Sequence, residues 1–110
     1  MQPYERLEVE WAKFNGVNPA GMVACASGTA ALHLALEALG LKCRIITSDF
    51  NMVAVPRAIA AAGCKPIFVD CDDKLLLDVP QLYKLDKDQM FGVIATHIYG
   101  RQCDMDKLHK

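Results

Sequence analysis

The sequence lacks several features that would mark whole classes of protein. It has no apolar run of about 18 residues, so a membrane-spanning helix is not expected. Its 12 lysines and arginines are balanced by 13 aspartates and glutamates, for a net charge of -1, which leaves no basic excess to contact nucleic-acid phosphates. Its N-terminus lacks the basic start and apolar core of a signal peptide. We therefore expect a cytoplasmic protein that binds neither membrane nor nucleic acid.

The cysteines also lack a recognisable pattern. There are 5 of them, an odd number, and none belongs to the closely spaced pair that is typical of zinc sites. We expect reduced thiols, with Cys25 and Cys71 packed as small apolar side chains in strand-like runs. His97 and Cys103 are one conceivable metal pair, but nothing nearby in the sequence completes it.

What the chain does have is the composition of one globular domain spanning residues 1–110, with 53% apolar and 23% charged residues. Short apolar runs alternate with helical periodicity. The expected strands are 22–26, 44–47, 65–70 and 91–97, and the expected helices are 4–15, 29–39, 53–62, 78–85 and 104–110. This alternation predicts an α/β fold with a mostly parallel sheet of about four strands flanked by helices. Such a sheet leaves an exposed edge, which indicates part of a larger architecture.

One strand-to-helix junction carries the strongest local pattern. Residues 26–31 (ASGTAA) join the expected strand to a helix. Small residues at such a turn let backbone N–H groups approach an anion, and a helix N-terminus favours negative charge. Ser27 and Thr29 can each cap the helix or donate a hydroxyl to a phosphate oxygen. The turn is either a phosphate site or an ordinary capped turn. The absence of GxGxxG or a Walker lysine disfavours the usual nucleotide folds.

The same residues resemble a known family. Residues 26–36 (ASGTAALHLAL) resemble the opening of the DegT/DnrJ/EryC1/StrS family, which comprises pyridoxal-phosphate-dependent sugar aminotransferases of fold type I. Residues 58–70 (AIAAAGCKPIFVD) resemble the family's AGAKPVFVD stretch, and residues 77–82 (LDVPQL) resemble NIDPELI. Residues 97–105 (HIYGRQCDM) are similar to HLYGQPADM, and residues 8–17 (EVEWAKFNGV) to FEKEFAEYLGV. The resemblance covers nearly the whole chain, in order, and implies the N-terminal part of the family's large domain.

The resemblance implies a site for pyridoxal 5′-phosphate (PLP). In the family the Ser-Gly-Thr turn holds the cofactor phosphate, so Ser27, Gly28 and Thr29 are the expected cradle. The family's SFTFVAT segment places an aromatic residue against the pyridine ring, and residues 48–55 (SDFNMVAV) put Met52 at that position. A methionine can also pack on a ring face, through its polarizable sulfur.

The sequence departs from the family pattern in ways that bear on catalysis. Val55 and Arg57 stand where the family has threonine and asparagine. The family's carboxylate that pairs with the pyridine nitrogen lies in an EDAAQA segment beyond the position of Lys110, and its Schiff-base lysine lies further on. The lysines present are expected at helix surfaces, in loops or at the terminus. Since PLP chemistry needs both groups, we expect this chain not to transaminate alone.

Weaker candidates lie elsewhere in the sequence. His97 ends an expected strand, where parallel sheets place ligands, but the interpretation as a core histidine bonded to a backbone carbonyl is slightly favoured. Asp70, Asp72 and Asp73 form an acidic cluster, which a solvated loop explains more simply than a metal site.

The expected function is that of a truncated relative of a PLP-dependent nucleotide-sugar aminotransferase that keeps half of a phosphate site. Three explanations are open. The chain is one piece of an enzyme whose lysine comes from another chain, or it is a non-catalytic module that binds a phosphorylated small molecule or self-associates. The third is a degenerate product that folds by self-association. In each case apolar surface is left to be buried, so we expect a homo-oligomer or a partner chain that supplies the missing half of the fold.

Overall fold

The computed structural model describes residues 1–40, 43–85 and 92–108. The chain forms two compact units, Met1–Ala31 and Leu32–Lys110. Helix α2 (Gly28–Leu39) begins in the first unit and continues into the second.

The first unit contains helix α1 (Pro3–Asn15), which confirms the helix predicted from Tyr4. Its start is fixed by a capping box, in which the N–H of Gln2 donates to the Glu5 carboxylate at 2.6 Å. The helix ends because Gly16 adopts the left-handed conformation (φ 68°), which glycine reaches without steric cost. A short 3-10 helix, η1 (Pro19–Gly21), follows.

The predicted buried strand at residues 22–26 is wrong. Met22 has extended backbone angles (φ -110°, ψ 133°), but no strand in the described chain pairs with this segment. The N–H of Ala24 donates instead to Glu8 Oε1 at 2.8 Å. Cys25 is exposed rather than packed. The local sequence favours extended backbone, whereas a strand also requires a hydrogen-bonded neighbour, which is absent from the described residues.

The second unit is built on a parallel sheet of three strands in its described residues, rather than about four. Strands β1 (Arg44–Ser48) and β2 (Lys65–Val69) confirm two predictions. The strand predicted at 91–97 is shorter, as β3 (Gly92–Ile94), and Phe91 lies outside the described residues. The strand order is β2-β1-β3, with both pairings parallel.

The predicted helices of this unit are present, two of them shortened. Helices α2 and α3 (Ala54–Ala61) agree with their predictions. Helices α4 (Val79–Leu82) and α5 (Met105–Leu108) are shorter than predicted, and residues 109 and 110 lie outside the described range. A 3-10 helix, η3 (Ile98–Gly100), lies between β3 and α5. Within the described ranges, no helix is both long and apolar enough to cross a membrane.

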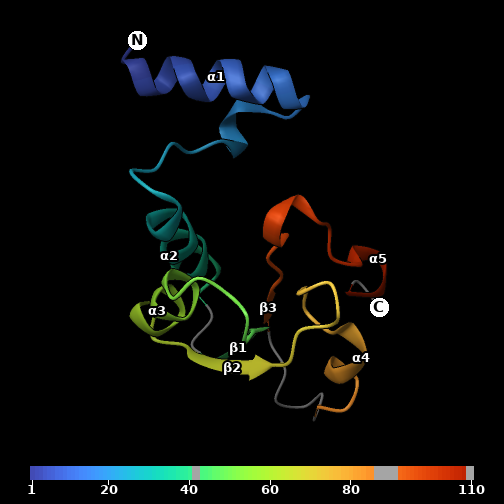
Figure 1. Cartoon of the computed structure of the whole chain (residues 1–110). Coiled ribbons are helices and arrows are strands. Elements are labelled where there is room, and N and C mark those ends of the chain that lie inside the picture. The colour runs from blue at the N-terminus through green and yellow to red at the C-terminus, as the bar shows by residue number, and fades with distance from the viewer. Residues whose placement is uncertain (41–42, 86–91, 109–110) are drawn as a thin grey trace. The chain divides into compact units, whose positions relative to one another are not determined.

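Helices cover both faces of the sheet, each over its own hydrophobic core (Figure 1). Adjacent residues of a strand point to opposite faces, so Ile45 and Ile46 enter different cores. The core under α2 and α3 comprises Leu36, Ile45, Val55, Ile59, Ala62 and Cys64. The core on the other face comprises Ile46, Val69, Leu77 and Leu82, with Leu108 of α5 packed against it. The carboxyl ends of all three strands meet at one edge of this layered structure.

Candidate functional site

The Ser-Gly-Thr turn begins helix α2, as predicted. The C=O of Ser27 accepts the first helical hydrogen bond, from the N–H of Ala31 at 3.0 Å. Its Oγ accepts a second, from the N–H of Ala30 at 3.1 Å. Ser27 is therefore the N-cap of the helix. The sequence left two hydroxyls open between capping and binding: that of Ser27 caps the helix, whereas that of Thr29 does not.

The next two residues carry hydrogen-bond donors that the helix does not use. Within the described part of the chain, the N–H groups of Gly28 and Thr29 donate to no protein acceptor, as is normal in a first helical turn. Both residues are exposed. A Cβ added to Gly28 would meet no atom within 4 Å, so the space beside it is open. Two N–H groups and one hydroxyl thus form a donor set that fits a phosphate group.

Met52, the predicted ring-packing residue, lies in the second unit, between β1 and α3. Its side chain is 72% exposed. Its backbone is held in place, because its N–H donates to Asn51 Oδ1 at 2.8 Å and its C=O accepts from the N–H of Val55 at 3.1 Å. The Met52 side chain is thus exposed to solvent while hydrogen bonds hold its backbone in place. Met52 and the Ser-Gly-Thr turn belong to different compact units, and their grouping into one site stays a prediction.

Asn51, which the sequence analysis did not single out, links the carboxyl ends of two strands. Its Nδ2 donates to Thr96 Oγ1 at 2.9 Å and to Thr47 Oγ1 at 3.2 Å. Thr47 is fully buried and donates its own hydroxyl to the C=O of Ile94 at 3.2 Å. Strand β1 is central in the sheet, and the chain pairs β2 with one of its edges and then β3 with the other. The carboxyl ends of β1 and β3 therefore meet at a topological switch point, where open α/β sheets bind ligands. Polar residues following two apolar strands were the signal that would have found it.

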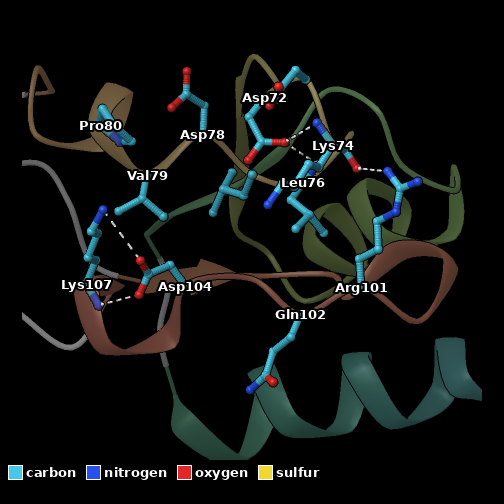
Figure 2. A pocket seen from close by; sticks show the side chains of 12 residues that line it. Asp72, Lys74, Leu76, Asp78, Val79, Pro80, Arg101, Gln102, Asp104 and Lys107 are labelled. Carbon is cyan, nitrogen blue, oxygen red and sulfur yellow. Dashed lines mark hydrogen bonds and ion pairs between the residues drawn. The ribbon is translucent and has the colours of Figure 1, made fainter.

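A cavity of about 910 Å³ opens elsewhere in the second unit, between residues 72–80 and residues 101–107 (Figure 2). Asp72 Oδ1 shapes one wall by accepting from the N–H groups of Lys74 at 2.8 Å and Leu76 at 3.0 Å. Arg101 reaches across, and its Nη1 donates to the C=O of Lys74 at 2.9 Å. The acidic cluster predicted as a solvated loop therefore also forms the wall of a cavity.

The charge of this cavity decides which ligands it suits. Its acidic lining residues are Asp72, Asp73, Asp78 and Asp104, and its basic ones are Lys74, Arg101 and Lys107. The Asp104 carboxylate and the Lys107 ammonium already form an exposed ion pair at 3.5 Å. The slight acidic excess opposes a phosphate group. The Ser-Gly-Thr turn is therefore the better candidate for holding a phosphate group.

His97 has a structural role that differs from the predicted one. It is exposed, and its Nδ1 accepts a hydrogen bond from the N–H of Cys103 at 3.0 Å, so its prediction as a core histidine bonded to a carbonyl is wrong. Cys103 is buried and its Sγ donates to the C=O of Thr96 at 3.3 Å. Over residues 1–40, 43–85 and 92–108, no group of three or more His, Cys, Asp or Glu side chains is placed to hold a metal ion.

Comparison with known proteins decides the family. A sequence profile of the DegT/DnrJ/EryC1/StrS aminotransferase family matches residues 2–110. The chain belongs to this family. The GDP-perosamine synthase of Vibrio cholerae is 35% identical over 107 residues, which are 94% of this chain and 29% of that protein. The dTDP-4-amino-4,6-dideoxy-D-glucose transaminase of Shigella dysenteriae is 32% identical over 102 residues, 92% of this chain and 27% of that protein. This family member thus spans less than a third of the length of these curated relatives.

Solved structures of the family share the fold. DesI, crystallised in the presence of its TDP-sugar product, matches with a TM-score of 0.84 at 31% identity, over 99% of this chain and 28% of that chain. The sugar aminotransferase Spr1654 from Streptococcus pneumoniae, in its PLP form, has a TM-score of 0.86 over 99% of this chain and 28% of its own, and at 24% identity it supports the fold alone. The family and the α/β fold predicted from the sequence are confirmed. The family is PLP-dependent.

Proposed function

We propose that this chain supplies the phosphate-holding part of a PLP-dependent nucleotide-sugar aminotransferase. The parent reaction transfers an amino group from an amino-acid donor to a keto-sugar nucleotide. The observation that carries the proposal is the unused donor set at Gly28 and Thr29, at the start of α2. Family membership over residues 2–110 supports it independently.

The residues of this chain have defined tasks in the proposed site. The N–H groups of Gly28 and Thr29 and the hydroxyl of Thr29 donate to the phosphate oxygens, and the start of the helix favours the negative charge. Ser27 keeps the helix start in position through its cap. Met52 packs its sulfur on the ring. When bound, PLP supplies an electron sink for the reacting amine carbon.

We further propose that this chain does not transaminate by itself. An amine that attacks a carbonyl is activated by desolvation or by a neighbouring cation. Every lysine in the described ranges is exposed, namely Lys13, Lys65, Lys74, Lys84 and Lys107. The reactive lysine and the carboxylate partner of the pyridine nitrogen then lie outside the described part of residues 1–110. An odd number of cysteines favours a reducing compartment, so we place this protein in the cytoplasm.

The phosphate site is tested by calorimetric titration of the full chain with pyridoxamine 5′-phosphate. This ligand has no aldehyde, so it cannot react with lysines. We expect a Kd of about 1 mM, as a few exposed hydrogen bonds allow, and much weaker binding of pyridoxamine, which lacks the phosphate. Equal binding of the two ligands would contradict the proposal.

Two variants locate the binding. Gly28→Ala places a methyl group in the open space beside the donors, where it meets no protein atom, so the fold is kept and binding weakens about tenfold. Gly21→Ala is the matched control, because a Cβ there also meets nothing within 4 Å. Thr29→Val removes only the hydroxyl and should weaken binding a few-fold. Unchanged binding by Gly28→Ala would rule out the turn.

A second candidate function, a self-associating or ligand-binding module without catalysis, is favoured by the surface of α1. Tyr4, Leu7, Trp11 and Phe14 recur at the three- and four-residue spacing of one helix face. All four are exposed, Phe14 by 80%, and the Trp11 and Phe14 rings stack with centroids 5.4 Å apart. Beside them, Leu7 and Trp11 line a smaller apolar cavity of about 250 Å³ with Met22. Exposed apolar surface of this kind marks an association site, and we propose a second copy of this chain as its partner.

A further inference from the structure

Two cysteines stand at the same level of two neighbouring strands. Cys43 directly precedes Arg44 of β1, Cys64 directly precedes Lys65 of β2, and Arg44 and Lys65 are partners in the parallel register. The N–H of Lys65 donates to the C=O of Cys43 at 2.9 Å, so the ladder extends to the cysteines. Neighbouring strands lie about 4.8 Å apart, and a disulfide needs Cα atoms about 4.4–6.8 Å apart. The backbone therefore already has the spacing of a disulfide.

The two side chains also lie on the same face of the sheet. Cys43 is two residues from Ile45, and alternate residues of a strand share a face. Cys64 belongs to the same buried cluster as Ile45, and Cys43 packs against that cluster. The thiols also interact electrostatically: burial raises the pKa of Cys43, and Cys64 raises it further. Neither side chain has to change face for the sulfur atoms to meet.

We propose that Cys43 and Cys64 are a disulfide-forming pair, a modification site that links the start of β1 to the start of β2. The oxidant is a small disulfide such as glutathione disulfide. The Cys43 thiolate attacks one of its sulfurs and releases one glutathione thiolate. The Cys64 thiolate then attacks Cys43 Sγ, forms the Sγ–Sγ bond and releases the second glutathione. Two protein thiols lose two protons and two electrons, and one glutathione disulfide becomes two glutathione thiols.

Exposure sets the order of these steps. Cys43 is partly exposed, whereas Cys64 is 7% exposed, so the oxidant meets Cys43 first and Cys64 completes the bond from inside. The link closes the segment that contains α3 and lies at the amino ends of the strands. The loop bearing Met52 lies beyond the carboxyl end of β1, so this inference is independent of the proposed phosphate site.

The test is oxidation of the full chain carrying Cys25→Ser, which removes an exposed thiol that would join copies of the chain. After incubation with glutathione disulfide, we expect an intact mass lower by about 2 Da. Peptide mapping should place the link between Cys43 and Cys64. The melting temperature should rise by about 10 °C, as a loop-closing disulfide allows. Oxidation should leave pyridoxamine 5′-phosphate binding unchanged.

Variants and alternative products decide the outcome. Cys43→Ser should abolish the link with little effect on the fold, and Cys71→Ser should leave it intact. Because Cys64→Ser alters the core, the mass shift of the unaltered pair carries the test. The proposal is overturned by an unchanged mass, by a link that maps to another cysteine pair, or by a persistent gain of about 305 Da on Cys43. That gain would mean that Cys64 does not reach the mixed disulfide.

Discussion

The Nδ2 of Asn51 lies 2.9 Å from the Oγ1 of Thr96 and donates a hydrogen bond to it, although the residues are 45 positions apart in the sequence. The same amide group donates to Thr47 Oγ1, and Asn51 Oδ1 accepts from the N–H of Met52. One side chain thus ties together the ends of β1 and β3 and the start of the loop that displays Met52. The position of that loop relative to the two strands therefore depends on the Asn51 side-chain amide.

We predict that Asn51→Ala lowers the free energy of unfolding by about 1–2 kcal/mol, because all three hydrogen bonds of the side chain are lost, one of them to the buried Thr47. Asn51→Asp keeps an acceptor for Met52 but loses both donors, so it should cost at least as much. Urea denaturation measures both changes. Wild-type stability in Asn51→Asp would show that the amide donors do not hold the strands together.

The two hydrophobic cores should respond separately to mutation. Ile45→Val and Ile59→Val alter the same core and should each cost about 1 kcal/mol. Combined, they should depart from additivity by about 0.5 kcal/mol or more. The combination of Ile46→Val with Ile59→Val affects opposite faces and should be additive within about 0.3–0.5 kcal/mol. Equal coupling in both pairs, measured by denaturant unfolding, would mean that the sheet does not separate the cores.

Self-association through α1 predicts a clear difference between neighbouring positions. Phe14→Glu places a charge on the exposed apolar face and should weaken dimerisation at least tenfold in sedimentation experiments. Lys13→Glu is the control, because it introduces glutamate at the neighbouring position, which does not belong to the apolar face. Equal dissociation of both variants, or a monomeric wild-type chain, would exclude this face as the interface.

The thiol of Cys43 should lose its proton at a higher pH than an ordinary cysteine, because its pKa is raised. Burial, and secondarily Cys64, raises its pKa above the ordinary value of 9.0. Alkylation of Cys43 by iodoacetamide, followed by mass spectrometry, should therefore keep accelerating as the pH passes 9.0. Cys64→Ala should shift this profile to lower pH. A rate that levels off below pH 9.0 in the unaltered chain would contradict the raised pKa.

The same shift has a consequence for stability. Because the folded-state pKa lies above the unfolded one, the protonated thiol contributes stability that is fully present below pH 9.0. That contribution is lost as the pH rises through the folded-state pKa. Cys43→Ala should therefore show a smaller decrease in stability over this alkaline range.

Elements that depend on local interactions could be predicted from the sequence alone. Helix α1 follows from its spacing, from the Gln2 and Glu5 capping box and from the stop at Gly16. The start of α2 follows from Ser27, whose hydroxyl oxygen accepts a hydrogen bond from the N–H of Ala30, three residues further on. These interactions act within one helical turn, so a short stretch of sequence contains all the information. The family resemblance, carried by such local motifs, was recoverable for the same reason.

Contacts between residues far apart in the sequence could not be predicted, because they depend on how the strands pair. The segment 22–26 has strand-like residues but no strand partner in the described chain, and partners are set by residues far away in the sequence. Nothing local to Asn51 specifies Thr96 as its acceptor, and nothing local to Cys43 specifies Cys64 as its neighbour. Both contacts arise because parallel pairing brings the ends of separate strands to one level. Pairing register is a property of the assembled sheet, which no single window of sequence contains.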